Sequence, residues 1–278
     1  MHNFALITGA STGIGKVFAL ELAKQKDLNL ILTARRANLL EEVKRQVEEI
    51  WSGQSLKCVV LPSDLSSYDE RVKLIESCST FNVSLLVNNA GFGSVTEFSK
   101  SNTEWELNMI ALNCQALLHL TRYFGPIMAE SFQKTTDRGK IINISSVASF
   151  QAMPYMATYA ATKAFVTSFS LAVGREKGFS GVDILALCPG PTASDFHLVA
   201  GLKEKMTILP GMSAESVVQQ ALAASRNGKS LHVNGINNFI MSQFSRFFTK
   251  KFAATIVEYL LREQVGRKTK WASNIDKS

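Results

Sequence analysis

The sequence has few of the residues that build disulfide frameworks and metal sites. Among its 278 residues are only four cysteines and four histidines, and Cys58, Cys78, Cys114 and Cys188 are far apart, without a Cys-x-x-Cys or Cys/His spacing. We therefore expect neither a disulfide scaffold nor a metal site, and we expect the cysteines to be reduced thiols.

Long apolar runs and long runs of one charge are also missing. No uninterrupted apolar segment approaches the roughly 20 residues of a membrane-spanning helix. A glycine-rich segment begins at Thr8 and leaves no room for a signal peptide. The net charge is +7, but no run of Lys and Arg is longer than two. We expect a cytoplasmic protein that binds no nucleic acid, whose positive charge favours a phosphate-bearing cofactor.

No Pro/Gly/Ser-rich linker divides the chain, and 46% apolar residues are enough for one large core. Apolar patterns predict strands at 4–8, 28–33, 56–61, 85–88, 140–144, 182–187 and 231–233, and helices after 13 and at 39–51, 68–80, 103–131, 159–177 and 214–226. This alternation without hairpins predicts an α/β fold, a Rossmann-type doubly wound parallel sheet in a single catalytic domain at 1–235.

Three glycines lie between the first strand and the first helix. Without Cβ atoms, such residues let the backbone turn sharply and approach a pyrophosphate at the helix N-terminus. The predicted cofactor segment comprises Gly9, Ser11, Thr12, Gly13, Ile14 and Gly15. The same glycines could instead form a plain strand-to-helix turn.

The end of the second strand indicates the type of dinucleotide. An acidic residue there would bind the adenosine ribose and exclude a 2′-phosphate. This chain has Ala34 instead, followed by Arg35 and Arg36, whose guanidinium groups suit a phosphate. NADP(H) is the predicted cofactor, although the two arginines could also be solvated residues at a helix start.

Ser146, Tyr159 and Lys163 form the predicted catalytic set. Lys163 lies one helical turn after Tyr159, near enough to lower the pKa of a phenol that is ordinarily about 10. Ser146 follows a strand and could hold a substrate oxygen, or it could only cap a local turn. With the glycine segment, these residues predict a nicotinamide-dependent oxidoreductase.

These motifs, in this order, resemble the classical short-chain dehydrogenase/reductase family over roughly residues 4–235. The matching residues are Thr8-Gly9-x-x-x-Gly13-x-Gly15, Asp64-Leu65, Asn88-Asn89-Ala90-Gly91, Asn113, Ser146, Tyr159-x-x-x-Lys163, Pro189-Gly190 and Thr192. The resemblance implies an NADP-dependent carbonyl–alcohol oxidoreductase with Tyr159 as acid/base.

The resemblance also implies roles for the other matching residues. Asp64 and Leu65 would flank the adenine, and Asn89, Ala90 and Gly91 would support the cofactor. Asn113 would hold a proton-relaying water, Tyr159 and Lys163 would bind the nicotinamide ribose, and Pro189, Gly190 and Thr192 would border the nicotinamide. A homo-dimer or homo-tetramer through helices 103–131 and 159–177 is implied as well.

Two positions depart from the family pattern. Thr12 stands where many NADP-preferring members have a basic residue, so Arg35 and Arg36 would have to recognise the phosphate alone. Extra residues around 133–138 are expected to form a surface loop.

Residues expected to face the substrate are mostly apolar or aromatic, which suits an apolar carbonyl or alcohol. They are Phe92, Phe150, Gln151, Met153, Pro154, Tyr155, Phe196 and His197. Any of them could instead pack the loops, and His197 is a weaker alternative acid than Tyr159.

Residues 236–278 read as an amphipathic helical extension, with phenylalanines at near-helical spacing. Packing on the domain or on a second subunit, a substrate lid and a membrane-surface contact are the alternatives. For the whole protein, the alternative to an enzyme is a catalytically silent dinucleotide-binding sensor.

Overall fold

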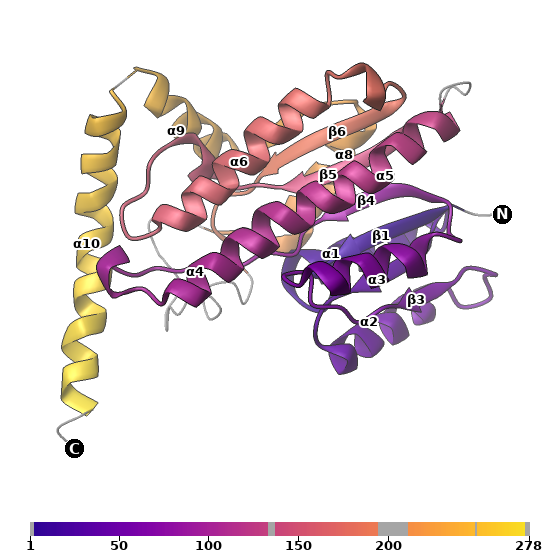
Figure 1. Ribbon diagram of the computed structural model, residues 1–278, viewed down its shortest axis with the longest axis horizontal. Coiled ribbons are helices and arrows are strands. Elements are labelled where there is room, and N and C mark those ends of the chain that lie inside the picture. Colours follow the sequence, from indigo (N-terminus) through magenta and orange to yellow (C-terminus); the bar gives the residue numbers. More distant parts are fainter. Residues whose placement is uncertain (1–2, 133–136, 194–210, 248, 276–278) are drawn as a thin grey trace.

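In the computed structural model, which describes residues 3–132, 137–193, 211–247 and 249–275, a seven-stranded parallel sheet runs through the molecule (Figure 1). Its order is β3-β2-β1-β4-β5-β6-β9. The strands are β1 (Phe4–Thr8), β2 (Asn29–Thr33), β3 (Cys58–Val60), β4 (Val83–Asn88), β5 (Gly139–Ile144), β6 (Val182–Cys188) and β9 (Leu231–Val233). Short strands β7 (Thr192–Ala193) and β8 (Met212–Ser213) pair separately. Strands β2 and β3 are added on one side of β1, and β4 and the later strands on its other side. Folds of this kind bind ligands at the point where the order of strand addition reverses, here between β1 and β4.

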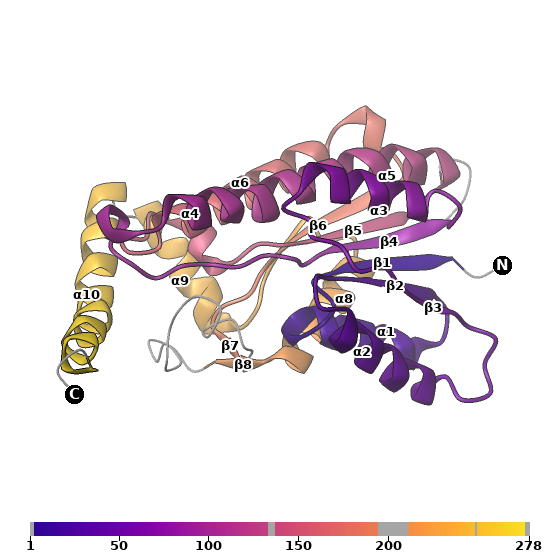
Figure 2. The ribbon, with the colours of Figure 1, turned by 60° about the horizontal axis from the view of Figure 1, so that its bottom comes forward.

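Helices cover both faces of the sheet (Figure 2). On one face lie α1 (Gly13–Gln25), α2 (Ala37–Ile50) and α8 (Ala214–Arg226); on the other lie α3 (Tyr68–Cys78), α4 (Thr103–Ile110), α5 (Leu117–Phe132) and α6 (Ala157–Val173). Single turns are formed by η1 (Phe98–Lys100), η3 (Val147–Phe150) and η4 (Lys177–Phe179). The predicted Rossmann-type doubly wound fold is confirmed.

Strand β1 shows why the strand sequences are apolar throughout. Ala5 and Ile7 pack with Phe18 of α1 in one core cluster, whereas Leu6 belongs to the cluster on the opposite face. Because both faces are covered, successive side chains are all buried and no polar alternation appears.

Among the predicted helices whose bounds differ from the structure, the two longest differ most. The helix expected at 103–131 is interrupted by a π-helical segment, η2 (Ala111–Ala116), between α4 and α5. The helix expected at 159–177 begins earlier, at Ala157, and ends at Val173, where the Gly174 N–H bonds back to carbonyls of the last turn. Apolar spacing does not register a π-turn or a helix end, because both depend on local hydrogen bonds.

The C-terminal segment forms two helices, α9 (Ile236–Phe247) and α10 (Lys250–Ile275), at one end of the molecule (Figure 1). Ala253, Val257 and Leu261, four residues apart on α10, are buried. Side chains of Ile236 and Ile240 on α9 are exposed. No helix in the described ranges combines the length and hydropathy needed to cross a membrane.

Candidate active site

The predicted site residues come together because each group follows the carboxyl end of a parallel strand. The glycine segment follows β1, Arg35 and Arg36 follow β2, Asp64 and Leu65 follow β3, Asn89 to Gly91 follow β4, Ser146 follows β5, and Pro189 to Thr192 follow β6. All six strands are parallel neighbours, so their carboxyl ends lie at one edge of the sheet.

The loop between β1 and α1 requires glycine at two positions. A Cβ on Gly15 would lie 2.2 Å from the Gly9 carbonyl oxygen, and a Cβ on Gly9 would lie 2.8 Å from Asn89 Nδ2. Gly9 also has φ +64°, a left-handed value that favours glycine. The bare backbone at the start of α1 therefore fits a dinucleotide pyrophosphate.

Thr8 and Asn89 tie this loop to the end of β4. Thr8 Oγ1 accepts hydrogen bonds from the backbone N–H groups of Asn89 and Ala90, both at 2.9 Å. Asn89 Nδ2 donates to the carbonyls of Thr8 at 2.9 Å and Gly9 at 3.2 Å. These bonds fix the Asn89 to Gly91 segment beside the glycine loop.

Arg36 is the arginine that reaches the glycine loop. Its Nη2 donates to Thr12 Oγ1 at 3.1 Å and lies 3.3 Å from Ser11 Oγ, while Arg35 is exposed at the same sheet edge. The family pattern suggested a basic residue at position 12. Here Thr12 instead accepts a hydrogen bond from the guanidinium of Arg36, the N-cap residue of α2.

Asp64 and Leu65 shape the loop after β3. Asp64 Oδ1 accepts from the Ser66 backbone N–H at 3.0 Å and from Ser66 Oγ at 2.7 Å. The Leu65 side chain is buried, and its carbonyl accepts from Arg71 Nη1 at 2.8 Å. Local bonds therefore hold this loop near the carboxyl end of β3.

Ser146, Tyr159 and Lys163 meet beyond the end of β5. The Ser146 hydroxyl is hydrogen-bonded to the Tyr159 phenol and accepts from the Ala148 N–H at 3.1 Å. Lys163 Nζ lies 5.7 Å from the centre of the Tyr159 ring and donates to the Ile144 carbonyl at 2.8 Å. The structure thus brings together the three groups that the sequence predicted as catalytic.

Burial dominates the electrostatics of this trio. It raises the pKa of Tyr159 to about 12, although the Ser146 hydrogen bond acts in the opposite direction, and it lowers the pKa of Lys163 to about 8. The sequence predicted that Lys163 would lower the phenol pKa, whereas in the structure burial raises it. The Lys163 ammonium donates to the Ile144 carbonyl, and burial is the largest cause of the Tyr159 pKa shift.

Asn113 is positioned by the π-helical segment η2. Its Oδ1 accepts from the Phe92 N–H at 3.1 Å, and its Nδ2 donates to the Phe92 carbonyl at 2.9 Å and to Thr162 Oγ1 at 3.0 Å. A Cβ on Gly91 would lie 2.9 Å from Asn113 Oδ1 and 3.6 Å from Lys163 Nζ. Gly91 therefore lies between the side chains of Asn113 and Lys163, close to both. Thr162, which accepts from Asn113, could not be recognised from its place beside Lys163 alone.

The segment after β6 lies over Ser146 and under α9. The Pro189 carbonyl accepts from the Val147 N–H at 3.0 Å, and Thr192 Oγ1 donates to the Gly190 carbonyl at 3.0 Å. A Cβ on Gly190 would lie 2.3 Å from Asn238 Nδ2. Asn238, which sequence reasoning missed, closes this side of the site from the C-terminal segment.

The apolar residues expected near the substrate fall into two groups. Phe92, Met153 and Tyr155 pack with Tyr159 in one cluster, and Phe150, Gln151 and Pro154 are half-buried in the same loop. Phe196 and His197 lie outside the described residues.

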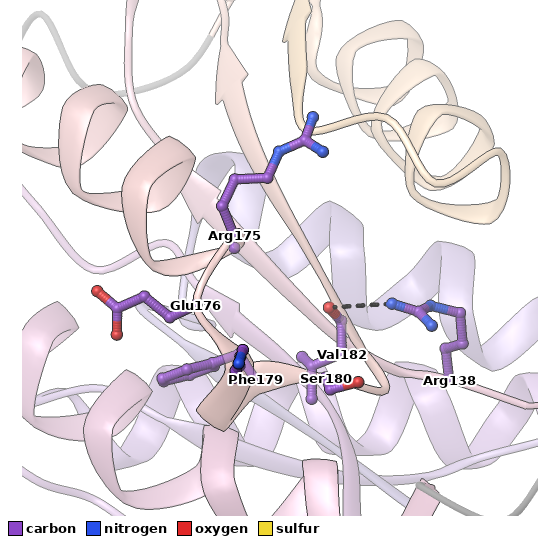
Figure 3. A pocket seen from close by; sticks show the side chains of 8 residues that line it. Arg138, Arg175, Glu176, Phe179, Ser180 and Val182 are labelled. Carbon is purple, nitrogen blue, oxygen red and sulfur yellow. Dashed lines mark hydrogen bonds between the residues drawn. The ribbon is translucent and has the colours of Figure 1, made fainter.

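A separate hollow lies at the opposite edge of the sheet (Figure 3). It is lined by Arg138, Gly174, Arg175, Glu176, Lys177, Phe179, Ser180 and Val182. Arg138 there binds Asp183 at 2.6 Å and faces the Val182 carbonyl at 3.5 Å. The hollow lies at the amino ends of β5 and β6, whereas Ser146 follows the carboxyl end of β5. It is therefore remote from the site.

Comparison with known proteins matches this arrangement. The family model described as short chain dehydrogenase matches residues 3–204, and the chain belongs to this family.

Two curated relatives and one solved structure illustrate the similarity. A very-long-chain 3-oxoacyl-CoA reductase of Neurospora crassa is 31% identical over 184 residues, 66% of this chain and 54% of that protein, so this chain spans about half the length of that relative. A 7beta-hydroxysteroid dehydrogenase of Clostridium sardiniense is 30% identical over 220 residues, 78% of this chain and 80% of that protein. A short-chain dehydrogenase from Sphingobium yanoikuyae in complex with NADPH has a TM-score of 0.77 at 25% identity, covering 92% of this chain and 95% of that one.

Proposed function

We propose that this chain is an NADP(H)-dependent oxidoreductase that interconverts a carbonyl and an alcohol on an apolar small molecule. One observation carries the proposal: the hydrogen-bonded Ser146 and Tyr159, with Lys163, lie at the same sheet edge as the glycine loop. A proton-transferring group and a dinucleotide cradle at one edge are what carbonyl reduction requires.

When bound, the nicotinamide supplies or accepts the hydride. In the reducing direction, Tyr159 donates its phenolic proton to the substrate oxygen, and the Ser146 hydroxyl stabilises the negative charge that develops there. With a pKa of about 12, Tyr159 stays protonated near neutral pH and is ready to act as the acid. Lys163 lies beside it and would bind the ribose, and Asn113, which holds the Phe92 backbone, would also hold a relaying water. In the oxidising direction the same residues act in reverse.

The relatives suggest which carbonyls to try first. A panel would include 3-oxoacyl thioesters, oxosteroids and simple apolar ketones, since the relatives are named for the first two classes. Phe92, Met153 and Tyr155 favour apolar groups around the carbonyl. Formation of alcohol in step with NADPH consumption supports the proposal. The alternative, a sensor without turnover, has no use for Ser146 beside the buried Tyr159 and Lys163.

We expect Arg36→Ala to weaken NADPH use by about 1.5 to 3 kcal/mol, the value of a charged hydrogen bond to phosphate, with little effect on NADH. Arg35→Ala should act in the same direction. The measurement is kcat/KM for each dinucleotide at a fixed carbonyl concentration.

Arg45→Ala is the matched control, because Arg45 is an exposed arginine on the same helix, α2. It should leave the ratio of the two dinucleotides unchanged. Equal kcat/KM for NADPH and NADH in the unmodified protein would refute the cofactor assignment.

A pH profile should show the lowered pKa of Lys163, whose ammonium form is present below about 8 and lost above it. We expect kcat/KM for NADPH to be constant below this pKa and to fall about tenfold per pH unit well above it. Lys163→Arg, whose guanidinium keeps its charge, should be less active but lack this decline. A profile that stays flat to about two units above the pKa would contradict this role for Lys163.

We also propose a homo-dimer or homo-tetramer and a division at residue 235. Exposed apolar side chains on α4, α5 and α6 support an oligomer through these helices. They are Trp105, Leu107, Ile110, Leu118, Ile127, Phe165 and Leu171. Within the described part of 236–278, Asn238 lies against Gly190, and Ala253, Val257 and Leu261 are buried, which supports packing of this segment on the 1–235 domain.

A further inference from the structure

The C-terminal helix α10 makes a direct contact with the loop that leads to Tyr159. Tyr155 Oη donates a hydrogen bond of 3.1 Å to Glu258 Oε1 of α10. The same carboxylate oxygen accepts from Arg262 Nε at 2.7 Å, so Arg262 holds Glu258 in place. Figure 1 shows α10 standing at the end of the molecule where this loop lies. The proposed catalytic trio does not account for Glu258 or for Tyr155.

Tyr155 has an unusual backbone conformation. Its φ is +65°, a left-handed value that a bulky side chain adopts only where its surroundings hold it. Three contacts do so here. The Tyr155 carbonyl accepts from the Thr96 N–H at 2.9 Å, its ring packs against the cluster that contains Phe92 and Tyr159, and its hydroxyl binds Glu258.

The conformation of Tyr155 determines where α6 begins. The next residue, Met156, is the N-cap of α6 and makes no side-chain cap hydrogen bond. Tyr159 lies in the first turn that follows, which is closed by the Ala160 N–H to Met156 carbonyl bond at 2.9 Å. An uncapped first turn takes its direction from the residue before it.

Lys163 is held independently, one turn further along α6. Its Nζ donates to the Ile144 carbonyl at 2.8 Å, and its own carbonyl accepts from Ser145 Oγ at 2.8 Å. These two bonds of Lys163 do not involve Tyr155, whereas the first turn, which carries Tyr159, begins directly after it.

We propose that Glu258 is a positioning residue: it fixes Tyr155, and through Tyr155 the first turn of α6, so that the Tyr159 phenol stays against Ser146. This inference rests on the proposed function for its kinetic consequence. Its structural consequence, the order of the first turn, can be measured without turnover.

The test uses the full chain with four variants and one control. Tyr155→Phe keeps the ring and removes only the donor, Glu258→Ala removes the acceptor, Glu258→Gln keeps an acceptor, and the double variant combines the first two. Thr255→Ala is the matched control, since Thr255 is exposed one turn earlier on α10 and bonds only within its helix, to the Lys251 carbonyl.

We expect Tyr155→Phe and Glu258→Ala each to lower kcat about five- to tenfold, as for the loss of one hydrogen bond, with an unchanged dissociation constant for NADPH. The double variant should lose no more than either single variant, because both remove the same contact. Glu258→Gln should retain kcat within about twofold, since its amide oxygen still accepts. Hydrogen exchange at residues 153–163 should quicken in the impaired variants and not in Thr255→Ala.

Three results would overturn the inference. These are unchanged exchange and kcat in Tyr155→Phe and Glu258→Ala, losses that add in the double variant, and a loss of NADPH affinity parallel to the loss of kcat. If the unmodified protein reduces no carbonyl, the proposed function fails, and the exchange measurement alone still decides whether Glu258 orders the first turn. Should Glu258→Ala fail to fold, Tyr155→Phe and Glu258→Gln decide in the same way.

Discussion

Replacing Tyr159 by phenylalanine should lower turnover at least about 100-fold while NADPH still binds. The substitution keeps the buried ring in its cluster and removes only the proton that the substrate oxygen would take. Ser146 would lose its hydrogen-bond partner but keep the Ala148 contact, so the loop should stay folded. The measurement is kcat on a competent carbonyl, beside fluorescence titration of NADPH.

Tyr259→Phe is the matched control for this experiment. Tyr259 is 69% exposed on α10, so losing its hydroxyl should change neither kcat nor NADPH binding. If Tyr159→Phe kept near-normal kcat, Tyr159 would not be the acid, and His197 would be the next residue to test.

The second large effect is expected for Gly15→Ala. A methyl group at this position would lie 2.2 Å from the Gly9 carbonyl oxygen and 2.5 Å from Asn89 Nδ2, so the backbone of the loop has to move. Such overpacking costs about 3 kcal/mol of free energy. If this strain falls on the conformation that binds the dinucleotide, the dissociation constant for NADPH should rise about 100-fold. Calorimetric titration of NADPH measures it directly.

Gly178→Ala provides the comparison for the loop variant. An added Cβ there meets nothing within 4 Å, so NADPH affinity and thermal stability should remain as in the unmodified protein. Unchanged NADPH binding in Gly15→Ala would show that the glycine loop is not the dinucleotide cradle.

The sheet order and the place of the site follow from features that are local in sequence. Apolar runs separated by helical patterns predicted the parallel strands, and Gly9, Ser146 and Tyr159 follow strand ends or begin a helix. Because parallel strands share a carboxyl edge, knowing the strand ends is enough to place these residues together. Helix bounds were less accurate, as the π-helical segment at Asn113 shows, because a single hydrogen-bond shift leaves the apolar spacing almost unchanged.

Contacts between distant segments could not be predicted. Asn238 packs on Gly190, and Glu258 binds Tyr155 across 103 residues of chain, and neither pair belongs to a motif. The direction of the Tyr159 pKa shift was also missed, since spacing places an ammonium near the phenol but does not reveal how deeply both are buried. Arg36 could be named as a phosphate ligand, but its bond to Thr12 required coordinates.

Isotope transfer would show whether this chain reduces a carbonyl with hydride from NADPH. The protein would be incubated with NADPH deuterated at the transferable position and with the carbonyl panel, and products would be analysed by mass spectrometry. We expect an alcohol that carries one deuterium per molecule, formed over many turnovers by the unmodified protein and at least about 100-fold more slowly by Tyr159→Phe. Tight NADPH binding without deuterated alcohol from any member of the panel would contradict it and favour a dinucleotide sensor.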